Sequence, residues 1–188
     1  MADQFPRIEA DHRDFIERQQ MFFVATAAAD GRVNLSPKGQ DTLRVIDDQR
    51  VHWLNLTGSG NETAAHLLEN DRMTLMFCSF EKKPLILRLY GQARCVHVGD
   101  QDWDELSAPF GQHTGARQVY DLTVDLVQTS CGFAVPRYDF VEARDTLTRW
   151  ADNRGEDGIR EYWRKKNQES LDGLPTGVPV GDAAKADS

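Results

Sequence analysis

The sequence predicts an α+β protein in which one antiparallel β-barrel is covered by peripheral helices. Three observations favour this class. Segments typical of strands occur in pairs joined by short turns, so consecutive strands run antiparallel. Segments typical of helices stand between these pairs and not between every two strands, as a doubly wound parallel sheet would require. The composition, 40% hydrophobic and 28% charged, is that of a globular protein, and 188 residues favour one domain, or one domain with a terminal extension, over two full domains.

Two hairpins are predicted in the first third of the chain. Residues 21–26 and 32–36 flank the dipeptide Asp30-Gly31, whose glycine tolerates the positive φ of a tight turn. A second pair, 42–46 and 51–55, flanks a short polar turn. We therefore expect a four-stranded meander by residue 56.

Helices and two further strands surround this predicted meander. Residues 5–20 have the apolar periodicity of an amphipathic helix, and residues 62–69 form a short helix directly after a glycine loop. The apolar segments 73–78 and 85–98 are predicted strands. Gly91 inside the second of them indicates a bulge or bend of the kind that small barrels use at their corners.

The last third of the chain is predicted to hold a short helix at 100–106, a strand at 119–128 and a final helix at 143–167 that breaks at 153–158. Alternation in the strand predicts one solvent-exposed face that carries Asp121 and Asp125. We assign residues 1–142 to the barrel domain with its N-terminal helix. Residues 143–174 form a helical extension that packs on the barrel through its tryptophans, and residues 175–188 form a disordered tail.

Charge and cysteine content exclude several classes of function. The net charge of −8 and the pI of about 5.1 would repel a nucleic acid backbone and an anionic membrane surface. The longest apolar stretch, 21–29, is too short to span a bilayer. The N-terminus is polar and acidic, unlike a secretory signal, and three cysteines leave at least one unpaired. We expect a reduced, cytoplasmic setting, with Cys131 buried and structural and no metal site among the histidines.

The glycine loop at 58–61 is the first candidate binding element. Gly58 and Gly60 allow successive backbone N–H groups to face an anion, and Ser59 or Asn61 caps the helix that follows. The helix dipole would favour a phosphate at this point. The alternative is an ordinary flexible connector, and Glu62 in the first helical turn would oppose a phosphate dianion unless its carboxylate points away.

A second candidate element closes the first hairpin at residues 34–39. Lys38 can neutralise a phosphate, while Asn34 and Ser36 can form hydrogen bonds with the polar edge of a ring. The alternative is a turn with a solvated lysine. The loop at 107–117, which carries Phe110, His113 and Arg117, can shape a pocket, but its composition does not identify the ligand.

In combination these motifs resemble a known family. The hairpin ends in Ser-Pro-Lys-Gly, the strand His52-Trp53-Leu54 follows, Gly-Ser-Gly-Asn-Glu-Thr opens a helix, and Leu-Arg-Leu-Tyr-Gly comes later. This order, over about residues 20–100, is similar to that of the pyridoxamine 5′-phosphate oxidase family. The stretch 127–132 and the tryptophan-rich helix look like an uncharacterised branch of it. The resemblance implies the FMN-binding split-barrel fold and a homodimer with FMN in a cleft between the subunits.

Carried onto this chain, the resemblance assigns cofactor-binding roles to residues of three strands and the glycine loop. These residues are Asn34, Ser36, Pro37, Lys38, Trp53, Leu54, Ser59, Gly60, Asn61, Thr63 and Arg88. The oxidases have adjacent basic residues in their phosphate loop, where this chain has Gly60, Asn61 and Glu62. Phosphate charge is therefore expected to rest on Lys38, on backbone N–H groups and on Arg44 or Arg88.

The resemblance implies redox chemistry at a flavin, in which the protein supplies position and electrostatics. No catalytic side chain is assigned, and no counterpart of the Arg-x-His substrate signature is found, so the small-molecule substrate stays open. The leading hypothesis is an FMN-dependent oxidoreductase. The alternatives are a non-catalytic module that binds flavin, deazaflavin or haem on the same fold, or a dimeric scaffold that has lost its cofactor.

Overall fold

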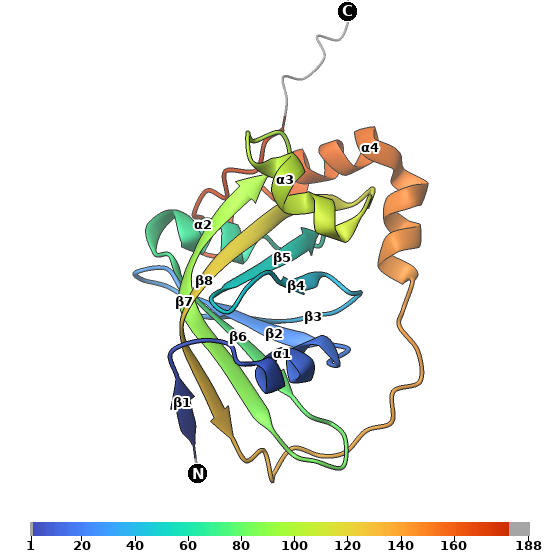
Figure 1. The fold of residues 1–188 in the computed structure, drawn as a ribbon. Coiled ribbons are helices and arrows are strands. Elements are labelled where there is room, and N and C mark those ends of the chain that lie inside the picture. Colours follow the sequence, from blue (N-terminus) through green and yellow to red (C-terminus); the bar gives the residue numbers. More distant parts are fainter. Residues whose placement is uncertain (1, 181–188) are drawn as a thin grey trace, which may run out of the picture.

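The computed structural model describes residues 2–180, which form one curled antiparallel sheet with helices around it (Figure 1). The elements in chain order are β1 (Asp3–Phe5), α1 (Ala10–Glu17), β2 (Phe22–Thr26), β3 (Asn34–Lys38), β4 (Leu43–Val45), β5 (Arg50–Leu56), α2 (Glu62–Glu69), β6 (Arg72–Cys78), β7 (Ile86–His97), α3 (Trp103–Ser107), the 3-10 turn η1 (Ala108–Phe110), β8 (Ala116–Ser130) and α4 (Thr146–Lys166). The predicted class, an antiparallel split barrel with peripheral helices, is confirmed.

The strand order is β3-β2-β6-β7-β8-β5-β4, and β1 pairs with β8. Both predicted hairpins are present, as β2 with β3 and β4 with β5. The predicted four-stranded meander is wrong, because β3 and β4 lie at opposite edges of the sheet. Curling brings these edges toward each other, since Phe22 of β2 and Leu43 of β4 line one cavity. The barrel is therefore split between the two hairpins.

The interior of the barrel is apolar, with Val24, Leu75, Leu89 and Val124 fully buried in one cluster. Gly91 marks a register shift in the pairing of β7 with β8, as its position in the strand predicts. A Cβ added at Gly91 would lie 1.9 Å from a backbone oxygen of β8, so only glycine fits there.

The outer face of β8 is less exposed than the alternation predicts. Thr123 and Asp125 are exposed, whereas Asp121 is buried. The Asp121 carboxylate accepts hydrogen bonds from Arg50 and Arg94, which hold its pKa well below the usual range although burial alone would raise it. Periodicity identifies the face of a strand, but it does not show that two arginines from neighbouring strands cover a carboxylate.

The ends of the chain also differ from expectation. The predicted helix at 5–20 is shorter, spanning Ala10–Glu17, and residues 3–5 form strand β1, which pairs with β8 in antiparallel orientation. In α4 the break falls at Gly155, inside the predicted interval 153–158. Residues 175–180 belong to the predicted disordered tail, yet Thr176 and Val178 are buried. Residues 181–188 lie outside the described residues.

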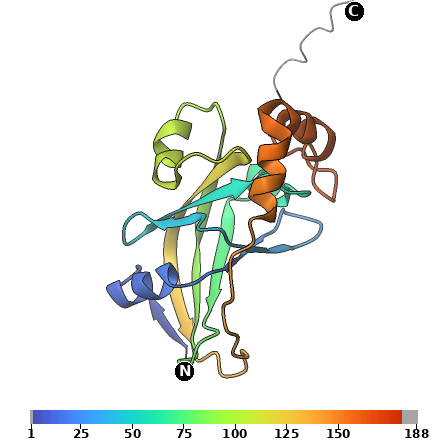
Figure 2. The same ribbon diagram turned by 90° about the vertical axis from the view of Figure 1, so that its right-hand side faces the viewer.

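Helix α4 and the segment after it lie at one end of the sheet, against the glycine loop (Figure 2). Ile159 and Trp163 of α4 form a buried cluster with Ala151 and with Val178 of the segment after the helix. An irregular segment, 131–145, links the far end of β8 to this helix along the side of the sheet (Figures 1 and 2). Within residues 2–180, no helix is both long and apolar enough to cross a membrane.

Candidate anion and cofactor pocket

A pocket of about 250 Å³ lies where β3, the end of β5, the glycine loop and β8 meet. Most of the predicted binding residues come together here, although they are far apart in the sequence. The structure places eight of the eleven in the lining: Asn34, Ser36, Lys38, Trp53, Ser59, Gly60, Asn61 and Thr63. The remaining three, Pro37, Leu54 and Arg88, do not line it.

Strand geometry explains which side chains of β3 reach the pocket. Successive side chains of a strand point to opposite faces, so Asn34, Ser36 and Lys38 share one face. These three are half-buried, whereas Leu35 and Pro37 on the opposite face are exposed. Asn34 Nδ2 donates a hydrogen bond to Thr63 Oγ1 at 3.2 Å, which ties β3 to the first turn of α2.

Two cations are held in this pocket with no carboxylate partner among residues 2–180. Lys38 Nζ lies 5.2 Å from the centre of the Trp53 ring and makes no hydrogen bond with a described residue. Burial, together with the positive charge of Arg117, lowers the Lys38 pKa to about 8. Burial likewise lowers the Arg117 pKa to about 10, which leaves both groups charged at neutral pH.

Arg117 is only 1% exposed and its hydrogen bonding is incomplete. Nη2 donates to the Gly60 carbonyl at 3.1 Å and Nε donates to Gln118 Oε1 at 3.0 Å. Nη1 is buried and has no partner in the described part of the chain. An unpaired charged donor in a buried position is costly, so the site is incomplete without an acceptor, and an anion supplies one.

The backbone of the glycine loop supplies further donors. Among the described residues, the N–H groups of Ser59, Gly60 and Asn61 have no hydrogen-bond acceptor. The eight-residue helix α2 begins directly after them, at Glu62. Free N–H groups at a helix N-terminus favour a negative charge, and here the buried Arg117 and the half-buried Lys38 line the same pocket. The pocket can therefore hold a phosphate group by both charge and hydrogen bonds.

A buried polar network fixes the floor of the pocket. Gln118 Oε1 accepts from Asn55 Nδ2 at 2.8 Å, and Gln118 Nε2 donates to Asn61 Oδ1 at 3.0 Å. Trp53 is buried and stacks on Tyr120 with a centroid distance of 4.6 Å. Trp53 thus lies mostly beneath the pocket surface and presents little of its ring to a ligand.

The residues that miss the pocket do so for identifiable reasons. Leu54 points to the other face of β5, where it packs with Phe110 in a second apolar cluster. Arg88 lies on β7 and donates to Ser130 Oγ at 3.3 Å. Arg44 forms a two-pronged ion pair with Asp41, with distances of 2.7 and 2.9 Å, so its charge is already compensated. Neither Arg44 nor Arg88 lines this pocket, and the expectation that one of them carries phosphate charge stays a prediction.

Sequence reasoning missed the role of Arg117. It placed this residue in a variable loop, but Arg117 lies in β8 beside a register shift between β5 and β8. It sits 57 residues beyond Gly60, and no motif links the two. The sequence did contain one signal. Arg117 stands beside the predicted strand 119–128, and an arginine is rarely buried in a strand unless its charge is paired.

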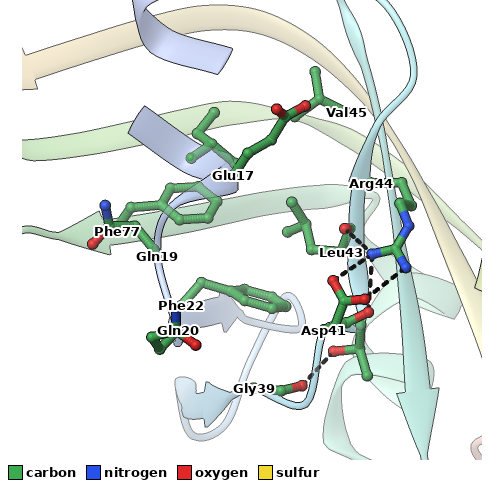
Figure 3. Close-up of a pocket in the computed structure, with 12 residues that line it drawn as sticks. Glu17, Gln19, Gln20, Phe22, Gly39, Asp41, Leu43, Arg44, Val45 and Phe77 are labelled. Atoms are coloured by element: carbon green, nitrogen blue, oxygen red, sulfur yellow. Dashed lines mark hydrogen bonds and ion pairs between the residues drawn. The ribbon is translucent and has the colours of Figure 1, made fainter. Parts of the chain in front are cut away.

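A cavity of about 140 Å³ lies at the split of the barrel, between α1, Phe22 of β2 and Leu43 of β4 (Figure 3). Its wall combines apolar side chains such as Phe22 and Phe77 with polar and charged ones, and the guanidinium of Arg44 is paired with Asp41, as the dashed lines show (Figure 3). Each charged side chain that lines this cavity has an oppositely charged partner among residues 2–180, so the cavity offers no ligand site comparable to the pocket of Lys38 and Arg117.

Metal and thiol chemistry find no support in the described residues. Within 2–180 there is no group of three or more His, Cys, Asp or Glu side chains that could hold a metal ion. Cys131 is exposed, so the expectation that it is buried is wrong. Cys95 is half-buried, and burial raises its pKa to about 12, which disfavours the nucleophilic thiolate.

Comparison with known proteins identifies the relatives of this chain. The profile of the family described as "Pyridoxamine 5'-phosphate oxidase" matches residues 8–136. The Aspergillus flavus protein described as "Pyridoxamine 5'-phosphate oxidase family protein ustO" is 38% identical over 183 residues, with 87% of this chain and 73% of that protein covered. Helix α4 and the residues after it lie outside the profile match.

Solved structures with the same fold include HupZ from Group A Streptococcus. It superposes with a TM-score of 0.52 at 21% identity and covers 65% of this chain and 99% of HupZ. A Lactobacillus delbrueckii protein, solved as a candidate pyridoxamine 5′-phosphate oxidase, superposes with a TM-score of 0.53 at 15% identity, covering 65% of this chain and 94% of that protein. At these identities the two structures establish the fold.

Proposed function

The chain belongs to the pyridoxamine 5′-phosphate oxidase family, and on this basis we propose that it binds FMN and acts as an FMN-dependent oxidoreductase on a small molecule. The observation that carries the proposal is the buried Arg117 guanidinium beside Lys38 and the glycine loop, whose Nη1 has no hydrogen-bond partner among the described residues. These groups fit the terminal phosphate of FMN, which is a dianion with three acceptor oxygens.

The cations and the hydrogen-bond donors of the pocket would hold different parts of FMN. Lys38 and Arg117 compensate its charge, and the N–H groups of the glycine loop donate hydrogen bonds to its oxygens. Asn34 and Ser36, on the same face of β3 as Lys38, offer polar groups to the ribityl chain or the ring edge. Bound FMN would supply a carrier that takes two electrons from a reduced donor and passes them to an acceptor.

Haem is less compatible with this pocket. Its iron needs an axial His, Cys, Met or Tyr ligand. The lining residues include no His, Cys or Met. Tyr120 lines the pocket, but it is fully buried, its hydroxyl donates to Gln118 Oε1, and burial raises its pKa well above the ordinary value. A deazaflavin with a phosphate tail presents the same anion as FMN, so ligand titration has to separate these two.

The proposal includes a homodimer with the pocket near the subunit interface. Edge strand β3 and the turn before it expose Leu35 and Val33, which are 62% and 72% exposed. The segment 131–145 exposes Phe133 and Val141. Large apolar side chains gathered on an edge strand and an extended segment are typical of a surface that a second copy covers. Light scattering on the purified chain measures its mass, and a monomer at micromolar concentration would contradict this part.

Titration of the ligand-free protein with FMN and with riboflavin tests the binding proposal. We expect FMN to bind at least tenfold more tightly, because only FMN carries the phosphate, and charged hydrogen bonds contribute about 1.5–3 kcal/mol each. Arg117→Met should remove most of this preference while leaving riboflavin affinity unchanged. Equal affinity of the wild-type protein for the two flavins would refute the assignment of the pocket.

Turnover is tested separately from binding. The FMN-loaded protein is mixed without oxygen with NADPH or NADH, and the flavin absorbance is followed before and after air is admitted. An oxidoreductase loses and regains this absorbance over repeated additions of the donor. Tight FMN binding with no reduction by either donor would favour the non-catalytic binding module.

A further inference from the structure

Residues 167–178, which follow α4 and are here called the C-terminal belt, lie against the glycine loop. Asn167 is fully buried, and its Nδ2 donates to the carbonyls of Gly58 at 3.1 Å and Ser59 at 3.3 Å. Its own carbonyl accepts from Asn61 Nδ2 at 3.3 Å. Asn167 is not among the residues that line the pocket. It therefore contacts the loop without contacting the ligand space.

These contacts fix the direction of the loop's peptide groups. In a trans peptide unit the C=O and the following N–H point in opposite directions. The carbonyls of Gly58 and Ser59 are held by Asn167, so the N–H groups of Ser59 and Gly60 point away from it. Those are two of the N–H groups that lack an acceptor among the described residues. Glycine-rich loops populate many backbone conformations, so this orientation needs an external restraint.

The belt also restrains the one acidic side chain in the pocket lining. Glu62 lies in the first turn of α2, where its carboxylate would repel a phosphate. That carboxylate accepts the backbone N–H of Leu171, with O···N distances of 3.0 and 3.2 Å. This hydrogen bond ties the Glu62 carboxylate to the belt, and the N–H of Leu171 compensates part of its negative charge.

The belt reaches the other wall of the pocket as well. Asp172 Oδ2 accepts the backbone N–H of Arg32 at 2.7 Å, and the Asp172 carboxylate forms an ion pair with the Arg32 guanidinium. Arg32 lies in the turn that leads into β3, the strand of Lys38. One continuous segment therefore fastens both the glycine loop and the approach to the lysine strand.

From these contacts we infer that Asn167 and the C-terminal belt are positioning elements that set the preference of the pocket for a phosphate-bearing ligand. This inference rests on the proposed function, because it concerns the same pocket. It assigns a role to a segment that lies outside the region matched by the family profile. Asn167 acts through the loop carbonyls and touches no ligand.

The test measures the ratio of the riboflavin and FMN dissociation constants, which isolates the contribution of the phosphate. Asn167→Ala removes both hydrogen bonds to the loop carbonyls, and we expect the ratio to fall at least tenfold with little change in riboflavin affinity. A merely structural role would weaken both flavins equally and leave the ratio unchanged. The matched control is Gln168→Ala, because the Gln168 side chain donates to the Trp163 carbonyl and not to the loop.

A second variant covers the case in which Asn167→Ala does not fold. Thr176 Oγ1 donates to the Asn167 carbonyl at 2.6 Å, and Thr176→Val removes this bond with nearly the same side-chain shape. We expect a fall of about threefold in the same ratio. An unchanged ratio in the folded variants, with the phosphate preference of the wild type intact, overturns the inference. Absence of that preference in the wild type refutes the proposed function instead.

Discussion

Lys38→Met is expected to stabilise the ligand-free protein. The Lys38 ammonium makes no hydrogen bond or ion pair with a described residue, and its nearest polar interaction is with the Trp53 ring. Burial and the charge of Arg117 lower its pKa from 10.5 to about 8. Methionine has a similar unbranched chain and needs no hydration, so it can keep the packing on Trp53 without the cost of the charge.

The size of the effect follows from the pKa. Lowering the pKa of a lysine from 10.5 to about 8 costs about 3 kcal/mol when the group is protonated in both folded and unfolded chains. The contribution of Lys38 to the free energy of unfolding therefore has the opposite sign to that of a lysine paired with a carboxylate, whose raised pKa stabilises the folded protein. The cost is fully present below pH 8, and it is relieved as the pH rises from 8 to 10.5, because the folded protein releases its proton first. At pH 10 about 1 kcal/mol of the cost should remain.

Urea unfolding of the ligand-free wild type and variant at pH 7 and pH 10 measures this effect. We expect Lys38→Met to be more stable by up to about 3 kcal/mol at pH 7, and the difference to shrink by about 2 kcal/mol at pH 10. Lys82→Met, at an exposed position, should change neither value by more than about 0.5 kcal/mol. A variant that is less stable at pH 7, or a difference that does not depend on pH, refutes the reasoning.

Two further substitutions test the frame around the pocket. Gly91→Ala places a Cβ 1.9 Å from a backbone oxygen of β8, so we expect a loss of more than about 3 kcal/mol in unfolding free energy, and a loss below about 1 kcal/mol would contradict the close approach. Asp121→Asn breaks a buried pairing with Arg50 and Arg94 and should cost about 3 kcal/mol at pH 7. Folding lowers the pKa of the Asp121 carboxyl, whose pKa in the unfolded chain is about 3.9. This carboxylate therefore stabilises the wild-type protein fully above about pH 3.9, and the stabilisation is lost progressively as the pH falls below that value. The difference between wild type and Asp121→Asn should therefore narrow on acidification, and a constant difference from pH 7 to pH 3 would count against the ion pair.

Local signals in the sequence predict most of the elements. The turn at Asp30-Gly31, the glycine loop before α2, the bulge at Gly91 and the break in α4 each depend on a glycine, which adopts backbone conformations or close approaches that other residues avoid. The positions of the two hairpins in the sheet could not be predicted in this way. Nothing between residues 38 and 43 indicates that the chain crosses from one edge of the sheet to the other, because strand order is decided by contacts between distant segments.

The residues of the candidate pocket likewise fall into some that the sequence predicts and others that it does not. Asn34, Ser36 and Lys38 are predictable, because they share one face of a short strand beside a recognisable turn. Arg117 is not, because its position depends on a bulge in β8 that brings it under Gly60. The motif resemblance assigned Leu54 and Arg88 as well. The Leu54 side chain lies on the other face of β5, and Arg88 pairs with Gln128, near the other end of β8 from the pocket residues Arg117 and Tyr120.

The energetic cost of the pocket is itself an argument for an anionic ligand. Half-buried Lys38 lies close enough to buried Arg117 that the charge of Arg117 helps to lower the Lys38 pKa, and no carboxylate among residues 2–180 compensates the two cations there. A ligand that binds only the folded state stabilises it by about 2.7 kcal/mol at one hundred times its dissociation constant. This gain is of the same size as the cost of charging Lys38. FMN at this concentration should therefore raise the stability of the wild type close to that of ligand-free Lys38→Met, while the same FMN concentration stabilises the variant less.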